Sequence, residues 1–322
     1  MDGGADTGGL SGQSPEPVLV FGEVHTRLLP HSQALSARDA ADLLRWGAGE
    51  QTRVSERPNL YVRSPDVLTG VDCHLPTASG AKVRAVGTVT TRATLTEGRL
   101  LQVGTFCAVT AEGPHQRRRW GHYLARPGIV EPYGTLPGRD VADGHLNDAR
   151  RPGDLDLGAI ADRRLVRMVR ARALDQQPPF KSRVTRLRWV ALPDVQGPSL
   201  TSFTLAEDGL RTAELGLPTG ITADAAAALC HDLALHDWLL TTLIRMVERS
   251  RLGSIDGRDA LAALRPAVDH LMHLWMPSAR VDRVLRPLWE VLEREPGFTR
   301  QWLNLVQRIR DQMALQTAAH LR

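Results

Sequence analysis

The stretch 222–249, TADAAAALCHDLALHDWLLTTLIRMVER, carries the strongest structural signal in the chain. Its apolar residues recur three and four positions apart, which places them on one side of a helix. Thr222 is a suitable N-cap, and Asp224 lies in the first turn, where the helix dipole favours an anion. Because further apolar residues such as Leu235 and Trp238 lie outside that stripe, the helix is expected to be buried on most sides. We expect it to be the central post of a helical C-terminal half whose interior leaves no room for reactive groups.

The segments that follow this helix are also predicted to be helical. Apolar residues at helical spacing indicate further helices over 258–276, 279–294 and from Thr299 onward, separated by short turns. Pro266 and Pro287 fall inside two of them, where each proline requires a kink or a restart. Helices joined by short turns favour an antiparallel bundle, here over residues 221–322.

The first two thirds of the chain read instead as strands with a few helices. The continuous apolar run at 18–29 predicts a buried strand. Residues 82–96 and 99–110 alternate around Glu97-Gly98, which predicts a hairpin. Other predicted elements are helices over 36–47 and 157–174, and strands over 120–124, 183–192, 200–205 and 210–215, with a turn at Asp208-Gly209. The fold class is therefore α+β, with a disordered tail at 1–17, a strand-rich mixed domain at 18–216 and the helical bundle at 221–322.

Composition limits the compartment and the class of function. No run of 18 apolar residues is present, which argues against a membrane span, and the glycine-rich, acidic N-terminus does not resemble a signal peptide. Three cysteines far apart indicate a reducing, cytoplasmic setting. Phosphate-binding glycine loops, HExxH, paired CxxC and GxSxG motifs do not occur, so the sequence assigns no catalytic residue, no metal and no cofactor.

Arginines cluster between residues 150 and 190, where eleven Lys and Arg face four Asp. This segment is more positive than the whole chain, whose formal charge is +4. Two readings stay open: a surface that binds nucleic acid or another anionic partner, or arginines that pair with carboxylates elsewhere in the fold. The candidate patch, three of whose members align on one helical face and two on one strand face, comprises Arg163, Arg164, Arg167, Arg170, Arg186 and Arg188.

Two other constellations carry potential chemistry. Asp232 and His236 are four residues apart, as are Asp269 and His273, so facing helices could bring four metal ligands together. The helical wheel argues against this arrangement, because His273 points away from its apolar stripe while His236 lies on one; a buried, hydrogen-bonded His236 is the alternative. The nucleophile hypothesis rests on Cys73 in Asp72-Cys73-His74. Adjacent residues on a strand point to opposite faces, so its candidate partners are the more distant His25, His115 and His122.

Four stretches together resemble an uncharacterised family of actinomycete proteins. They are VLVFGEVHTRLLPHSQAL at 18–35, LTGVDCHLPTASGAKVRAVGTV at 68–89, HYLARPGIVE at 122–131 and LALHDWLLTTL at 233–243. Genes of this family lie in a conserved cluster beside one for a variant P-loop protein, and the family has no assigned activity. The resemblance implies a component of a cytoplasmic multi-protein system, with a P-loop-like NTPase of the same cluster as a candidate partner.

Three functional hypotheses follow. The first is a non-enzymatic interaction or regulatory subunit that docks a protein partner, with apolar residues near Trp289 or Trp302 as docking candidates. The second is a nucleic-acid-binding protein that uses the arginine patch. The third is an unrecognised enzyme, for which a cleft uniting several of His25, Asp72, Cys73 and His122 would be required.

Overall fold

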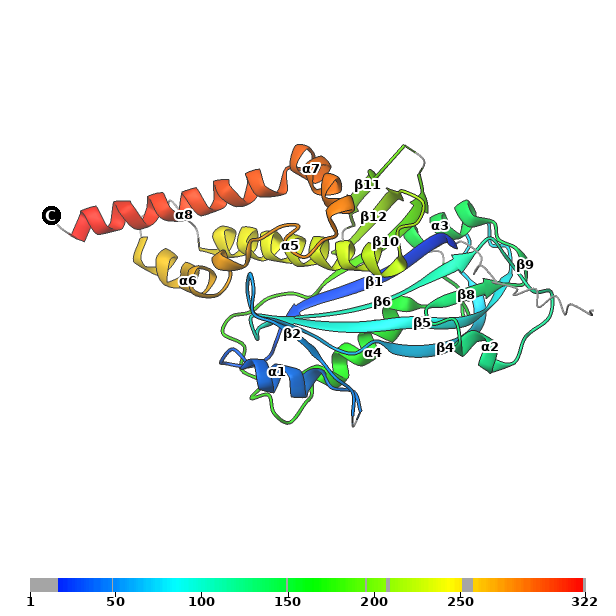
Figure 1. Cartoon of the computed structure of the whole chain (residues 1–322). Coiled ribbons are helices and arrows are strands. Elements are labelled where there is room, and N and C mark those ends of the chain that lie inside the picture. Colours follow the sequence, from blue (N-terminus) through cyan, green and yellow to red (C-terminus); the bar gives the residue numbers. More distant parts are fainter. Residues whose placement is uncertain are drawn as a thin grey trace, which may run out of the picture.

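The computed structural model describes residues 17–47, 49–148, 150–194, 196–206, 209–250 and 257–320. Residues 1–16 of the predicted tail, Asp208 of the predicted turn and residues 251–256 lie outside the described residues. A ten-stranded mixed sheet dominates the described part (Figure 1). Its main path runs β11 (Ser199–Leu205), β12 (Leu210–Leu217), β10 (Thr185–Pro193), β1 (Pro17–Leu28), β6 (Leu100–Thr110), β8 (Ile129–Pro132), β5 (Val83–Thr96), β3 (Tyr61–Arg63) and β2 (Arg53–Ser55), and β4 (Val67–Leu75) pairs with β5.

Strand β1 lies near the middle of this sheet, as its continuous apolar run predicted. It pairs antiparallel with β6 on one side and with β10 on the other. The predicted hairpin is confirmed as β5 and β6, whose turn places Glu97 and Gly98 at φ of 49° and 59°. Most pairings are antiparallel, but β10 with β12 and β6 with β8 are parallel. A smaller two-stranded sheet pairs β7 (Glu112–Gly113) with β9 (Gly134–Thr135).

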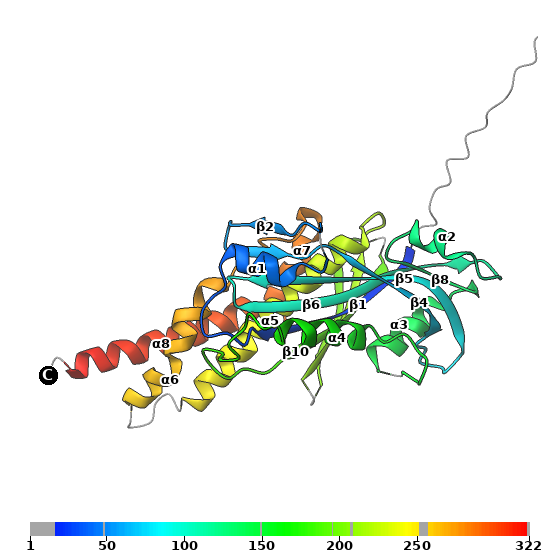
Figure 2. The same ribbon diagram turned by 90° about the horizontal axis from the view of Figure 1, so that it is seen from below.

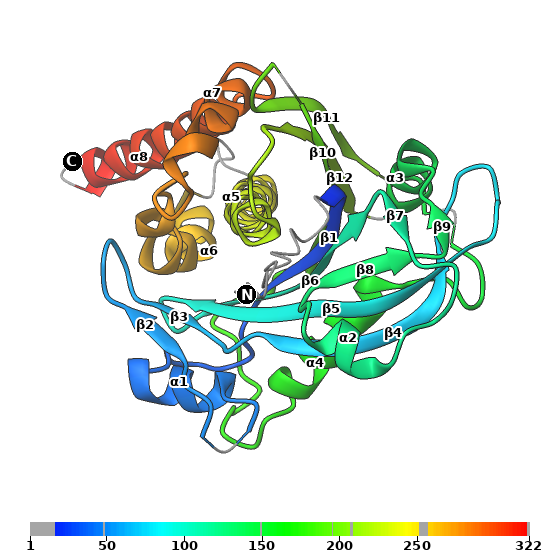
Figure 3. The same ribbon diagram turned by 45° about the vertical axis from the view of Figure 1, so that its right-hand side comes forward.

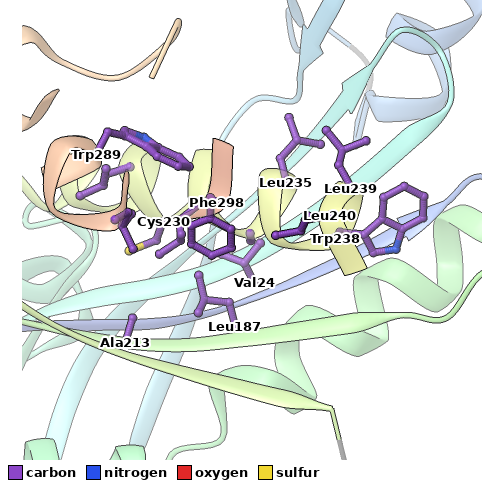
Figure 4. Packing of buried hydrophobic residues seen from close by; sticks show 14 of the residues in the cluster. Val24, Leu187, Ala213, Cys230, Leu235, Trp238, Leu239, Leu240, Trp289 and Phe298 are labelled. Atoms are coloured by element: carbon purple, nitrogen blue, oxygen red, sulfur yellow. The ribbon is translucent and has the colours of Figure 1, made fainter. Parts of the chain in front are cut away.

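Helix α5 (Ala223–Arg249) packs along one face of the sheet against β1, β6 and β10 (Figure 3). Thr222 caps it as predicted, because its side-chain oxygen accepts a hydrogen bond from the backbone of Ala225. Leu187 and Val24 of the sheet face Trp238 and other apolar residues of α5 (Figure 4). The prediction of a helix buried on most sides is therefore confirmed, and the sheet supplies much of the covering surface.

The remaining C-terminal elements lie on the outer side of α5. They are α6 (Gly257–His270), η1 (Met272–Leu274), η2 (Arg283–Leu285), α7 (Arg286–Arg294) and α8 (Phe298–His320). Helices α6 and α8 contact α5 and each other, α7 contacts β11, and α8 extends past the end of the sheet (Figure 1). The α+β class is confirmed, but an antiparallel bundle is not, since α5 shares its core with the sheet.

Two proline predictions have different outcomes in these helices. Pro266 lies inside α6, where the helix continues past it. The predicted helix 279–294 instead starts at Arg286, with Pro287 in its first turn. Proline suits that position because the first backbone N–H groups of a helix have no intrahelical acceptor.

The opposite face of the sheet is covered by α3 (Gly138–Leu146), α4 (Leu157–Val169) and, toward one end, α1 (Ala37–Leu44). Figure 2 shows α4 running along β1 and β6 on this face. Phe21, Glu23 and His25 of β1 point toward this layer, whereas Val20 and Val24 point toward α5, because successive side chains on a strand alternate between faces. Layers on both faces explain why β5 and β6 are buried along almost their whole length.

None of the helices in the described ranges combines the length and the apolar character that crossing a bilayer requires.

Candidate functional site

The arginine-rich segment forms the outer side of α4. Asp156 caps this helix as predicted, by accepting a hydrogen bond of 2.8 Å from the backbone of Ala159. The inner side of α4 is buried on the sheet, whereas Arg163, Arg167 and Arg170 are exposed. The side chains of these three arginines make no hydrogen bond or ion pair with any residue of the described ranges.

The other three predicted arginines have different environments. Arg164 is half-buried and lies over the ring of Trp46, with its guanidinium carbon 4.9 Å from the ring centroid. Arg186 is half-buried in the wall of a groove beside α4. Arg188 is 0% exposed and bonded to Glu23, so it cannot meet a partner at the surface. The structure therefore divides the predicted patch into an exposed arginine face, defined as Arg163, Arg167 and Arg170, and three arginines that contribute little to it.

The buried partner of Arg188 is a carboxylate on the neighbouring strand. Nε of Arg188 donates to Oε2 of Glu23 at 3.1 Å, and Nη1 donates to the backbone oxygen of His145 at 3.2 Å. Nε2 of His25 lies 3.0 Å from Oε1 of Glu23. Burial alone would raise the pKa of Glu23, but the hydrogen bond with His25 and the charge of Arg188 lower it to about 2. Glu23 is thus an ionised carboxylate inside the protein, held by two side chains.

Glu23 and His25 form the floor of a groove of about 420 Å³ between α4, β1 and β10. Its charged and titratable lining is Glu23, His25, Arg27, Arg150, Asp156, Asp162 and Arg186. When Nε2 of His25 carries the ring proton and donates a hydrogen bond to Glu23, Nδ1 keeps a lone pair. Nδ1 lies 3.9 Å from Oδ1 of Asp162. A histidine oriented in this way by a carboxylate can accept a proton from a molecule in the groove.

The sequence carries a signal for Glu23 as a functional residue. Glu23 interrupts an apolar run and is two residues from His25, a spacing that places both side chains on one strand face. Nothing in the sequence indicates that Arg188 lies directly opposite Glu23, because that pairing depends on the position of β10 beside β1.

The four residues of the enzyme hypothesis do not share a cleft. Asp72 on β4 pairs with Arg84 at 3.0 Å and with Arg117 at 3.1 Å. His122 lies on α2 (Trp120–Leu124), a helix where a strand was predicted, and contacts Glu131 at 3.0 Å. Burial, followed by the charges of Asp72 and of Asp154, raises the pKa of Cys73 to about 11, so its thiol is not an activated nucleophile. Of the four, His25 alone lies in the groove beside α4.

The four predicted metal ligands are not brought together either. His236 is buried and hydrogen-bonded, as the alternative reading predicted: Nδ1 lies 2.7 Å from the backbone oxygen of Asp232, and Nε2 accepts from the backbone of Met276 at 3.2 Å. His273 is exposed, and Asp269 pairs with Arg265 on its own helix at 3.5 Å. Within the described ranges, no group of three or more His, Cys, Asp or Glu is arranged to hold a metal ion.

The expectation that the interior around α5 has no room for reactive groups was wrong. His231, Asp232, His236 and Asp237 are all buried on this helix. Asp237 pairs with Arg211 of β12 at 2.6 Å, and burial raises its pKa to about 6 although the charge of Arg211 opposes the shift. The sheet supplies the partner of Asp237, whereas Asp232 and His236 bond to backbone groups of α5, Met276 and Ser278.

The predicted docking residues are also corrected. Trp289 and Trp302 are 4% and 3% exposed, and Trp302 stacks on Trp275 with ring centroids 4.4 Å apart. The exposed apolar residues of α8 are Leu303, Met313 and Leu315. A depression of about 360 Å³ between α6 and α8 is lined by Leu264, Val268, Ile309, Met313 and neighbouring residues.

Comparisons with known proteins do not place the chain in a family. No family model matches it, and neither the curated proteins nor the solved structures yielded a similar protein. The features of the structure that bear on function are the arginine face of α4, the groove beside it and the buried polar groups of α5.

Proposed function

We propose that this protein is a cytoplasmic, non-enzymatic interaction subunit that binds an acidic protein partner through the arginine face of α4. The observation that carries the proposal is that Arg163, Arg167 and Arg170 are exposed side by side without a carboxylate partner in the described ranges. Unpaired arginines on a rigid helix keep their donors available for the carboxylates of another molecule.

The contrast with other arginines supports this interpretation. Arg92 binds Asp66 and Asp224, Arg139 binds Glu214, and Arg211 binds Asp237. These arginines are paired within the fold, whereas the three arginines of the α4 face make no such pair with a described residue. The buried inner side of α4 fixes the helix on the sheet, so the three guanidinium groups are held on a rigid support.

The family resemblance gives the first partner to test, which is the P-loop-like NTPase expected from the same gene cluster. The protein would be purified with its partners from the native host, and the partners identified by mass spectrometry. We expect the variant Arg163→Gln/Arg167→Gln/Arg170→Gln to lose the specific partner at least tenfold. The matched control, Arg308→Gln/Arg310→Gln, removes two exposed arginines of α8 and should retain it.

Nucleic acid is the competing occupant of the same face, and the same variants separate the two cases. Fluorescence polarisation with DNA and RNA at low salt would be flat if the partner is a protein. Salt-sensitive binding that the triple variant loses and the α8 control keeps would assign the face to nucleic acid instead. Equal recovery of the protein partner by the wild type and the triple variant would contradict the proposed protein interface, and equal binding of nucleic acid by the two would contradict the competing case.

Catalysis in the groove is the second candidate function, and the orientation of His25 by Glu23 is the observation that favours it. A screen with phosphate esters and carboxylic esters would compare the wild type with His25→Gln. His122→Gln serves as the control, because His122 lies on another element. Turnover that disappears only in His25→Gln would support an enzyme, and no turnover with any substrate would count against it.

A further inference from the structure

A second polar cavity lies on the other face of the sheet, between α5, β3, β5, β6 and the segment around Arg280. Its volume is about 60 Å³, several times the roughly 10–15 Å³ that one water molecule needs. Pro58 and Ala279, both exposed, are part of its lining and connect it with solvent. The polar side chains in its wall include Arg63, Arg92, Thr96, His231, Asp232 and Arg280.

Two of these side chains are buried without a hydrogen-bond partner. His231 is 6% exposed, and neither of its ring nitrogens is bonded to a described residue. The hydroxyl of Thr96, which is 1% exposed, is also unpartnered. A buried polar group without a hydrogen-bond partner is destabilising, so two of them in one cavity indicate that the cavity suits a polar ligand.

The position of His231 depends on a glycine in the facing strand. A Cβ at residue 104 would lie 2.2 Å from Nε2 of His231, so only glycine leaves room for the ring between α5 and β6. Burial, followed by the charges of Arg92 and Arg63, lowers the pKa of His231 to about 3. The ring is therefore neutral at physiological pH and offers one N–H donor and one acceptor.

Guanidinium donors predominate in the wall. Arg63 uses only Nη2 for its contacts with Asp66 and Asp224, at 3.4 and 3.5 Å. Arg280 uses only Nη2, which donates to the backbone and side-chain oxygens of Asn59. The guanidinium of Arg280 also lies over the ring of Tyr61, 4.2 Å from its centroid. The remaining N–H groups of Arg63 and Arg280 have no hydrogen-bond acceptor among the described residues.

Acceptors in the wall are fewer. Asp232 is the one carboxylate among the residues that line the cavity, and its Oδ2 already accepts from the backbone of Ser278 at 2.8 Å. Asp66 and Asp224 balance the charges of Arg63 and Arg92, but neither carboxylate is among the lining residues. The cavity thus lacks acceptors rather than donors, and its complement is a small group rich in oxygen acceptors.

We propose that this cavity binds a small oxyanion, either inorganic phosphate or sulfate or the carboxylate of a small metabolite, through Arg63, Arg280 and His231. The proposal is independent of the α4 surface, because the two sites lie on opposite faces of the sheet.

Calorimetric titration at constant ionic strength tests this site with three anions and one neutral molecule. Sodium phosphate, sodium sulfate and sodium acetate are the probes, and glycerol is the neutral control. We expect saturable binding of at least one anion and none of glycerol; the strongest anion distinguishes an inorganic oxyanion from a carboxylate. Arg280→Gln should weaken that binding at least tenfold, whereas Arg265→Gln, whose side chain is 82% exposed on α6, should leave it unchanged.

A second variant tests the same site if Arg280→Gln does not fold. His231→Leu removes the unpartnered nitrogens, so the anion-free protein should keep or gain thermal stability while its response to the anion falls at least tenfold. Absence of saturable binding to the wild type would overturn the proposal. Equal affinity of His231→Leu and the wild type for the anion would overturn it as well. So would a structure of crystals grown with the anion in which only water lies between His231 and Arg280.

Discussion

Glu23 and Arg188 lie directly opposite each other on the antiparallel strands β1 and β10, and their side chains join across the pair at 3.1 Å while 1% and 0% exposed. Two charges placed this deep are tolerated because each has further partners: His25 for the carboxylate and the backbone of His145 for the guanidinium. Glu23 lies at the floor of the groove beside α4 and is hydrogen-bonded to His25, whereas Arg188 lies behind it and does not line the groove.

Removing one member of this pair should be far more damaging than removing both. Arg188→Met leaves a buried carboxylate without its cation, and we expect a loss of about 3–5 kcal/mol in the free energy of unfolding. The double variant Glu23→Leu/Arg188→Met leaves no unpaired charge and should recover most of that loss. Urea denaturation followed by circular dichroism measures both. If the double variant is as unstable as the single one, the pair is not the source of the effect.

Glu23 should also make stability depend on acid pH. Its folded pKa of about 2 is below the ordinary value of 4.5, so its contribution is present above pH 4.5 and is lost as the pH falls toward 2. The shift corresponds to about 3 kcal/mol. The difference in unfolding free energy between the wild type and Glu23→Gln should therefore shrink between pH 4.5 and pH 2.5. A difference that stays constant over that range would show that folding does not lower the pKa of Glu23.

Gly158 should be required because the carboxylate of Glu23 packs against the first turn of α4. A Cβ at residue 158 would lie 2.6 Å from Oε1 of Glu23, and we expect Gly158→Ala to destabilise the fold by about 1–3 kcal/mol. Gly121→Ala is the matched control, since a Cβ there meets no atom within 4 Å and alanine favours the helix. In thermal melts, the melting temperature of Gly158→Ala should fall below that of the wild type. The melting temperature of Gly121→Ala should rise or stay unchanged. Equal melting temperatures would contradict the close packing.

Cys73 should react slowly in the folded protein. With a pKa of about 11, roughly one thiol in a thousand is ionised at pH 8, and only the thiolate attacks an alkylating reagent. Mass spectrometry after iodoacetamide treatment should find Cys73 largely unmodified in native protein and fully modified in urea. Rapid labelling of Cys73 in the native protein would contradict the raised pKa and make Cys73 a candidate nucleophile.

The sequence by itself determined the features that depend on local periodicity and local chemistry. It determined the β5–β6 hairpin through alternation around Glu97-Gly98, and α5 through its apolar spacing and its Thr222 cap. It also placed Arg163, Arg167 and Arg170 on one side of α4, because helical spacing alone decides which residues share a face. Burial of His236 followed from its position on an apolar stripe.

The tertiary structure decided what lies opposite each face. Periodicity indicates that a surface of α5 is buried, but it does not say whether a helix or a sheet covers that surface. The sheet covers it, because β1 pairs with both β6 and β10 and these strands together form the face on which α5 packs. The same long-range pairing brought Arg188 to Glu23 and Gly104 to His231. Contacts between residues so distant in sequence follow from strand order, which no local pattern specifies.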